Sequence, residues 1–180
     1  MSVLPPITPF QSRILCMTST FFYVPFLFTI YRRVVKQGYY GKGHTRNITV
    51  GQWLGVLSLI TGACSMLYWQ NQRHDSWRYY LDLTMAKISG VVYFVCGYRY
   101  IMGSYRRIWG YALCGSTLGF YHLSNSWYLQ GSPYWVVCHG LMHLFTCCGQ
   151  TYTIHTMVEP SADNHCMTDI ENVVADKKIL

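Results

Sequence analysis

Acidic residues are almost missing from most of this 180-residue chain. Only Asp75 and Asp82 occur before residue 159. The other five follow it: Glu159, Asp163, Asp169, Glu171 and Asp176. Charged residues of both signs make up 12% of the chain, whereas soluble domains typically carry about 25%. This scarcity excludes an ordinary soluble domain and, with 51% hydrophobic residues, predicts a membrane protein.

The chain also lacks the cysteine pattern of a disulfide framework. Of its eight cysteines, only Cys166 lies outside the apolar runs of the sequence. The others lie within them: Cys16, Cys64, Cys96, Cys114, Cys138, Cys147 and Cys148. Because free cysteine packs like a small apolar residue, these thiols are expected to be packing residues and not bridges of a small secreted fold.

Five long apolar runs organise what remains. They cover residues 14–31, 51–69, 81–101, 108–123 and 134–158. About 20 apolar residues in a helix cross a bilayer, so residues 14–158 are predicted to form an all-α, polytopic membrane bundle of about five transmembrane helices. Residues 1–13 are expected to be an irregular N-terminal segment, and residues 159–180 a flexible acidic tail. Pro25 is expected to kink the first helix.

Small residues recur along one face of the second run. Gly51, Gly55, Ser58, Gly62 and Ser65 follow alternating steps of four and three residues. Residues at this spacing lie on one side of a helix, and small side chains let membrane helices approach closely. This face is therefore expected to pack against the backbone of a neighbouring helix.

Basic residues are distributed unevenly between the two ends of the predicted bundle. Ten lie in the first and third loops and the tail: Arg32, Arg33, Lys36, Lys42, Arg46, Arg99, Arg106, Arg107, Lys177 and Lys178. The opposite side has Arg13, Arg73 and Arg78. The positive-inside rule then places the N-terminus outside or in a lumen and the C-terminus in the cytosol. The sequon at Asn47 would face the cytosol and stay unglycosylated.

The same distribution bears on partners and location. The net charge of +7 comes from short loops between apolar runs, so nucleic acid is not an expected partner. Membrane lipids are the expected partners. Protein partners stay open, as does the choice between an endomembrane and the plasma membrane.

The strongest functional pattern is HGLMH in the last run. His139 and His143 are four residues apart, so both imidazoles project from one face of a helix. Thr146 and Gln150 continue that polar face. Because polar groups are costly in contact with lipid, the stripe is expected to face the interior of the bundle.

Further polar residues are expected at the depth of this histidine pair. They lie at the ends of three other helices: Ser65, Trp69, Asp82 (in the first turn of its helix) and His122. Two imidazoles one turn apart can chelate zinc, and a catalytic zinc usually has three protein ligands and one water. His139 and His143 are therefore expected as ligands, with His122, His74 or Asp82 as the third. Asp82 would orient the water, and Ser65 would stabilise an oxyanion during attack on an amide or ester.

Structural interpretations of these residues stay open beside the chemical one. An HxxxH pair also occurs as hydrogen-bonded packing histidines. Ser65 belongs to the small-residue face of its helix, Asp82 is equally consistent with a helix cap, and His122 with a polar residue near the membrane interface.

Three stretches resemble the CREST superfamily of membrane hydrolases: ACSMLYW, YYLDLTMAKISGVVYF and WVVCHGLMHLFTCCGQ. The superfamily includes alkaline ceramidases, progestin/adipoQ receptors, hemolysin III-like proteins and GPI-lipid remodelling proteins. Its pattern is Ser-x3-His ending the second helix, Asp opening the third and His-x3-His on the last. Four residues match it: Ser65, Asp82, His139 and His143. The resemblance implies a zinc cofactor, assistance by the serine and aspartate, and lipid amides or esters as substrates.

Two departures from the family pattern bear on activity. Trp69, which cannot ligate a metal, stands where the family has its first zinc-binding histidine. The family core has seven helices, and five are expected here. Three hypotheses follow: a zinc-dependent lipid amide or ester hydrolase of the ceramidase type, a catalytically inactive membrane scaffold or partner-binding relative, and a b-type haem protein using His122 with His139 or His143.

Overall fold

The computed structural model describes residues 6–36, 45–71, 76–101 and 103–158, and within these ranges the chain forms helices and no strand. The elements are α1 (Pro9–Ser19), η1 (Thr20–Phe22), α2 (Tyr23–Lys36), α3 (Thr45–Gln70), α4 (Trp77–Tyr100), α5 (Ser104–Leu129) and α6 (Trp135–Val158). The elements α1, η1 and α2 follow one another without a gap and together form the first rod. Each of the five predicted apolar runs is therefore a helix, and the prediction of an all-α bundle is confirmed.

The first rod begins earlier than predicted because residues 8–11 form a complete helix start. The Thr8 hydroxyl accepts a hydrogen bond from the Gln11 backbone at 3.2 Å, and the Gln11 side chain accepts one from the Thr8 backbone at 2.9 Å. This reciprocal capping box, followed by Pro9, starts α1 at Pro9 and not at residue 14. The 3-10 turn η1 precedes Pro25, in agreement with the local break that this proline predicts.

The start of α4 corrects the prediction for Asp82. Ser76 is the N-cap, and its hydroxyl accepts a hydrogen bond from the Tyr79 backbone N–H at 3.3 Å. The helix begins at Trp77, so its first turn contains no acidic residue and Asp82 lies in the second turn. The prediction of a first-turn or capping role for Asp82 was therefore wrong. The error arose because polar residues before the apolar run also adopt helical structure.

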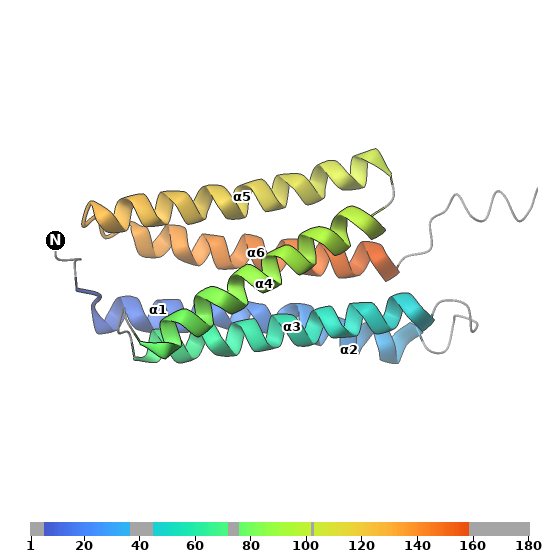
Figure 1. Ribbon diagram of the computed structural model, residues 1–180, viewed down its shortest axis with the longest axis horizontal. Coiled ribbons are helices and arrows are strands. Elements are labelled where there is room, and N and C mark those ends of the chain that lie inside the picture. Colours follow the sequence, from blue (N-terminus) through green and yellow to red (C-terminus); the bar gives the residue numbers. More distant parts are fainter. Residues whose placement is uncertain (1–5, 37–44, 72–75, 102, 159–180) are drawn as a thin grey trace, which may run out of the picture.

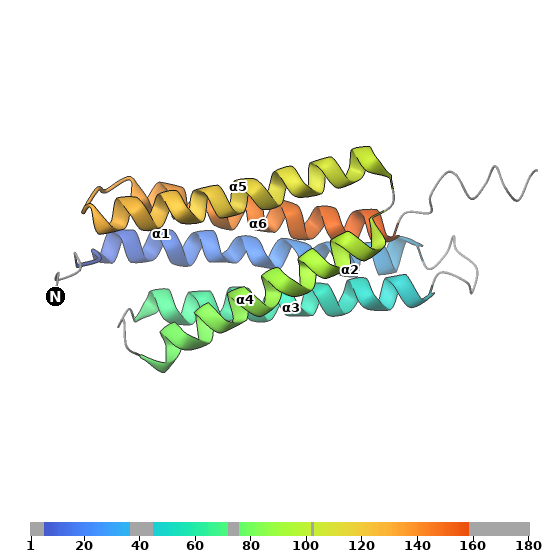
Figure 2. The same ribbon diagram turned by 45° about the horizontal axis from the view of Figure 1, so that its top comes forward.

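The rods run up and down, and α6 is their common neighbour (Figure 1). Helix α6 packs against α1, α2, α3, α4 and α5, while α5 packs mainly against α6. Figures 1 and 2 show α4 running obliquely from the end of α3 to the start of α5. Because of this course, α4 lies close to α3 and meets α5 chiefly near the connection between them.

The small-residue face of α3 packs as predicted. A Cβ added at Gly62 would lie 2.8 Å from Cβ of Phe22 and 3.2 Å from the backbone oxygen of Ser19. A Cβ added at Gly55 would lie 2.8 Å from Oγ1 of Thr29 and 3.2 Å from Cα of Phe26. Side chains larger than glycine would therefore push α3 away from the first rod.

Two helical stretches are long and apolar enough to cross a membrane by length and composition. They are Pro9–Arg32 and Thr49–Gln70, with mean hydropathies of 1.6 and 1.5. Helices α4, α5 and α6 have 24, 26 and 24 residues, but their Tyr, Trp, His and Gln side chains lower the hydropathy. Membrane association is thus supported by two helices, and the other three spans stay a prediction.

Large hydrophobic side chains are numerous on the outer surface of the bundle, and polar side chains are numerous in its interior. In the described part of the chain, 27 large hydrophobic side chains are exposed, and 14 hydrophobic residues are buried. Eleven buried residues are polar: Ser19, Thr29, Ser58, Thr61, Ser65, Ser89, Ser124, His143, Gln150, Thr153 and Thr156. The interior is therefore rich in hydroxyls and amides, and the outer surface is rich in aromatic and aliphatic groups.

Candidate functional site

The histidine pair lies at the end of the bundle where α3 ends and where α1, α4 and α6 begin (Figure 1). The ring centroids of His139 and His143 are 4.8 Å apart, with the rings at 77° to each other. His143 is buried, with 3% of its surface exposed, and His139 is half-buried. The predicted inward orientation of this pair is confirmed.

Each imidazole contacts a hydroxyl from a neighbouring helix. His143 Nδ1 is 3.0 Å from the Thr18 hydroxyl of α1, and His139 Nδ1 is 3.3 Å from the Ser124 hydroxyl of α5. Both hydroxyls also donate to backbone oxygens, Thr18 to Leu15 at 3.1 Å and Ser124 to Trp135 at 3.2 Å. Since a hydroxyl has one proton, these backbone bonds favour the tautomer in which each imidazole donates through Nδ1–H and has its lone pair on Nε2.

Gly140, inside HGLMH, lets α1 approach the pair. A Cβ added at this glycine would lie 3.2 Å from Cγ2 of Thr18. A side chain there would therefore press on the residue that hydrogen-bonds His143. Gly140 and His143 thus pack together against Thr18 of the first rod.

Ser65 and Asp82 form the second part of the layer. Ser65 is buried, and the Ser19 hydroxyl donates to it at 3.0 Å. Asp82 of α4 lies near Ser65. The Ser19–Ser65 hydrogen bond thus joins α1 to α3, with the Asp82 carboxyl of α4 beside it.

His122 does not join this layer. Its side chain is exposed on α5, with its ring 5.4 Å from that of Tyr121. In the described part of the chain, no group of three or more His, Cys, Asp or Glu residues is arranged to hold a metal ion. His74, the other histidine considered as a third ligand, lies outside the described residues. The described donor set is two imidazoles, which does not fit a three-ligand catalytic zinc.

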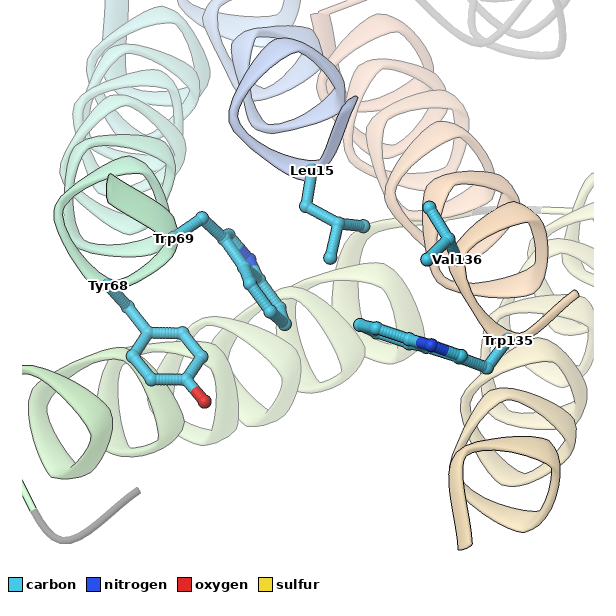
Figure 3. Packing of buried hydrophobic residues seen from close by; sticks show 5 residues of the cluster. All are labelled: Leu15, Tyr68, Trp69, Trp135 and Val136. Atoms are coloured by element: carbon cyan, nitrogen blue, oxygen red, sulfur yellow. The ribbon is translucent and has the colours of Figure 1, made fainter. Parts of the chain in front are cut away.

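Trp69 occupies the position beside the pair. Its ring centroid is 5.0 Å from that of His139 at an interplanar angle of 78°, and its surface is 5% exposed. Figure 3 shows Trp69 of α3 and Trp135 of α6 pointing toward each other, with Leu15 of α1 beside them. The Trp69 indole N–H is buried and has no hydrogen-bond partner. An apolar cluster thus covers the layer where the family pattern has a ligand.

A second polar network lies deeper along α6. Gln150 Nε2 donates to Ser89 of α4 at 3.1 Å, and the Ser58 hydroxyl of α3 is 2.9 Å from Gln150 Oε1. The Tyr93 hydroxyl is 2.7 Å from Ser58 and donates to the Leu54 backbone oxygen, also at 2.7 Å. The predicted inward orientation of Gln150 is confirmed, and its amide joins three helices.

Sequence reasoning missed the hydroxyls of Thr18 and Ser124, which contact the histidines, and that of Ser19, which contacts Ser65. Thr18, Ser19 and Ser124 each stand next to other polar residues, within or beside an apolar run. The sequence pattern therefore does not tell which residue of each polar group faces the interior. Comparison with protein-family models, with curated proteins and with solved structures gives no match. The resemblance to the CREST superfamily therefore rests on its own residues and stays a prediction.

Proposed function

We propose that this chain is a multi-pass membrane scaffold protein in which the layer resembling a hydrolase site holds the helices together. Membrane embedding is supported by the apolar outer surface, because 27 exposed large hydrophobic residues in the described ranges would be costly in water. Aromatic and aliphatic groups on the outer face of a bundle match the lipid environment. The five rods then cross the bilayer five times, with the C-terminus in the cytosol.

The ends of the rods carry the charge pattern that this topology needs. Arg32 lies near the end of α2, Arg99 in the last turn of α4, and Arg106 and Arg107 in the first turn of α5. All four lie at one end of the bundle (Figure 1). The opposite end has Arg13 and Arg78 among the described residues. The end opposite the histidine layer is therefore the cytosolic one.

One observation carries the scaffold role: the position of Trp69. Its buried ring packs against His139 where a third ligand would be needed, and both imidazoles already bond hydroxyls of neighbouring helices. In membranes, helices associate through small residues and interhelical hydrogen bonds, because lipid provides little hydrophobic drive. Hydrogen bonds of His139 join α5 to α6, those of His143 join α1 to α6, and those of Ser65 join α1 to α3 in this way.

The experiment compares the wild-type protein with His143→Ala and Thr18→Val in detergent. The scaffold role predicts that both variants lose thermal stability, by about 1–3 kcal/mol for a buried partner left unpaired, and that neither zinc content nor hydrolysis of ceramide or ester lipids depends on His143. A zinc content near one ion per wild-type chain, together with lipid hydrolysis that His143→Ala abolishes, would overturn the proposal.

That outcome would select the second candidate, a zinc-dependent hydrolase of lipid amides or esters. A specific observation favours it, since Nδ1–H donation leaves a lone pair on Nε2 of both His139 and His143, the tautomer that metal-binding imidazoles use. The Ser65 hydroxyl beside the Asp82 carboxyl also keeps the family arrangement. The haem alternative gains no support, because His139 and His143 lie on one helix and His122 is exposed.

A further inference from the structure

A groove opens on the outer side of the bundle between α4, α5 and α6 and extends from the middle of the bundle toward the end opposite the histidine layer. It exists because α4 runs obliquely and diverges from the α5–α6 pair (Figures 1 and 2). Its free volume is about 130 Å³, and its walls are mainly aromatic and aliphatic, with Phe94, Tyr98, Tyr111 and Phe145 among them. An engineered cavity of about 150 Å³ accepts benzene, so this groove has the volume for part of a hydrocarbon chain.

Glycines shape the groove. Gly90 and Gly97 of α4, Gly110 of α5 and Gly149 of α6 all line it. A Cβ added at Gly90 would have no neighbour within 4 Å, and one at Gly97 would lie 3.6 Å from Cδ1 of Ile101. The space at Gly90 is therefore open, and a larger side chain there would occupy the groove without displacing a helix.

A basic residue marks one end of the groove. Arg107 lines it, and its Nε donates to the Ile101 backbone oxygen at 2.9 Å. This bond uses one of the five N–H donors of the guanidinium and fixes its base beside the groove, while the side chain stays exposed. None of the residues that line the groove is acidic. The charge and the apolar walls are thus complementary to an anionic group attached to a hydrocarbon chain.

We propose that this groove binds an anionic glycerophospholipid, with an acyl chain against Gly90 and Gly97 and the phosphate at Arg107. The proposal rests on the membrane embedding proposed above, because the groove must then face lipid. A second copy of the chain is the competing occupant. A helix about 10–12 Å in diameter with its side chains could place only side chains in a volume of about 130 Å³, and Asp82 is the one acidic residue that the described helices of a second copy offer to the arginine.

The test measures lipid retained by the purified protein in detergent by native mass spectrometry, with phosphatidylglycerol and phosphatidylcholine of identical chains. The wild-type protein is expected to retain phosphatidylglycerol preferentially. Gly90→Leu fills the groove and should weaken retention of both lipids by about tenfold or more, since each excluded methylene counts for about a factor of four. Arg107→Gln should weaken retention of phosphatidylglycerol about fivefold and that of phosphatidylcholine less, because the choline cation offsets the charge of its phosphate.

Gly119→Leu is the matched control. Gly119 lies on α5, does not line the groove, and has open space around its Cβ position. Equal lipid retention by Gly90→Leu and Gly119→Leu would overturn the proposal, and so would a dimer that only Gly90→Leu disrupts. Alkaline carbonate extraction of wild-type membranes separates the two failures. Release of the chain into the supernatant refutes membrane embedding, whereas a retained chain without selective lipid binding refutes only the groove.

Discussion

Replacing Trp69 by histidine tests whether the missing ligand is what separates this layer from a zinc site. The ring centroid of Trp69 is 5.0 Å from that of His139, which is 4.8 Å from that of His143. Three nitrogens bound to one tetrahedral zinc at about 2.0–2.1 Å lie roughly 3.3 Å from each other. Rings with these separations can approach that geometry by rotating about their side-chain bonds. Trp69→His is therefore expected to bind zinc, and the wild-type protein much less.

The magnitudes follow from burial and linkage. Truncating a buried tryptophan to alanine costs about 3–5 kcal/mol, and an imidazole refills part of the space, so metal-free Trp69→His should be roughly 2–3 kcal/mol less stable than the wild type. Zinc at a hundred times its Kd returns about 2.7 kcal/mol. At roughly 2–4 °C per kcal/mol, zinc should raise the Tm of this variant by about 5–11 °C.

The assay is thermal unfolding in detergent with zinc or with a chelator, together with metal content of the purified chains. Trp69→Phe is the control, because it removes the indole N–H and part of the ring without adding a ligand. If zinc changed the Tm of Trp69→His and of Trp69→Phe equally, the reasoning that Trp69 stands at a ligand position would be refuted. A double variant with His143→Ala should lose the zinc-dependent stabilisation.

Three other changes have defined outcomes. Gly62→Ala should lower the free energy of unfolding by about 1–3 kcal/mol relative to Gly119→Ala, because both gain helix propensity but only Gly62 has atoms at 2.8 Å from its Cβ position; equal Tm values would contradict the packing. Gln150→Leu should cost about 1–3 kcal/mol by leaving the Ser58 and Ser89 hydroxyls without their amide partner, measured by thermal unfolding, and an unchanged Tm would show the network to be dispensable. Asn47 should stay unglycosylated in microsomes whereas a sequon added before residue 9 is glycosylated, and the reverse pattern would invert the topology.

Local sequence patterns predicted the helices and their inner faces. The five apolar runs became five rods, and Gly55 and Gly62 on one face of α3 contact the first rod closely. His143 and Gln150 point inward. These features could be predicted from the sequence because each depends on a single helix: on its apolar pattern and on the cost of exposing its polar groups to lipid. For α3 and α6 the inward face therefore follows from the sequence of the single helix.

Features that depend on two helices were harder to predict from the sequence. Asp82 was expected in a first turn, but Ser76 and the polar residues after it extend α4 by more than one turn. His122 was expected beside the histidine pair, yet its side of α5 is exposed while Ser124, two residues later, contacts His139. A helix advances about 100° per residue, so residues two positions apart point to nearly opposite sides. The position of a residue along its helix predicted which residues lie level with the histidine pair. The rotation of the helix about its own axis decides which of those residues contact the pair.

Trp69 illustrates how one residue can reverse the interpretation of a motif. Ser65 lies near Asp82, and the rings of His139 and His143 lie side by side. However, the polar groups of the layer bond to one another across helices, and the indole fills the remaining space beside His139. A site that must bind a metal and a substrate needs donors left free by the protein. In this bundle the Nε2 atoms are the donors left, and the response of Trp69→His to zinc measures whether they still converge.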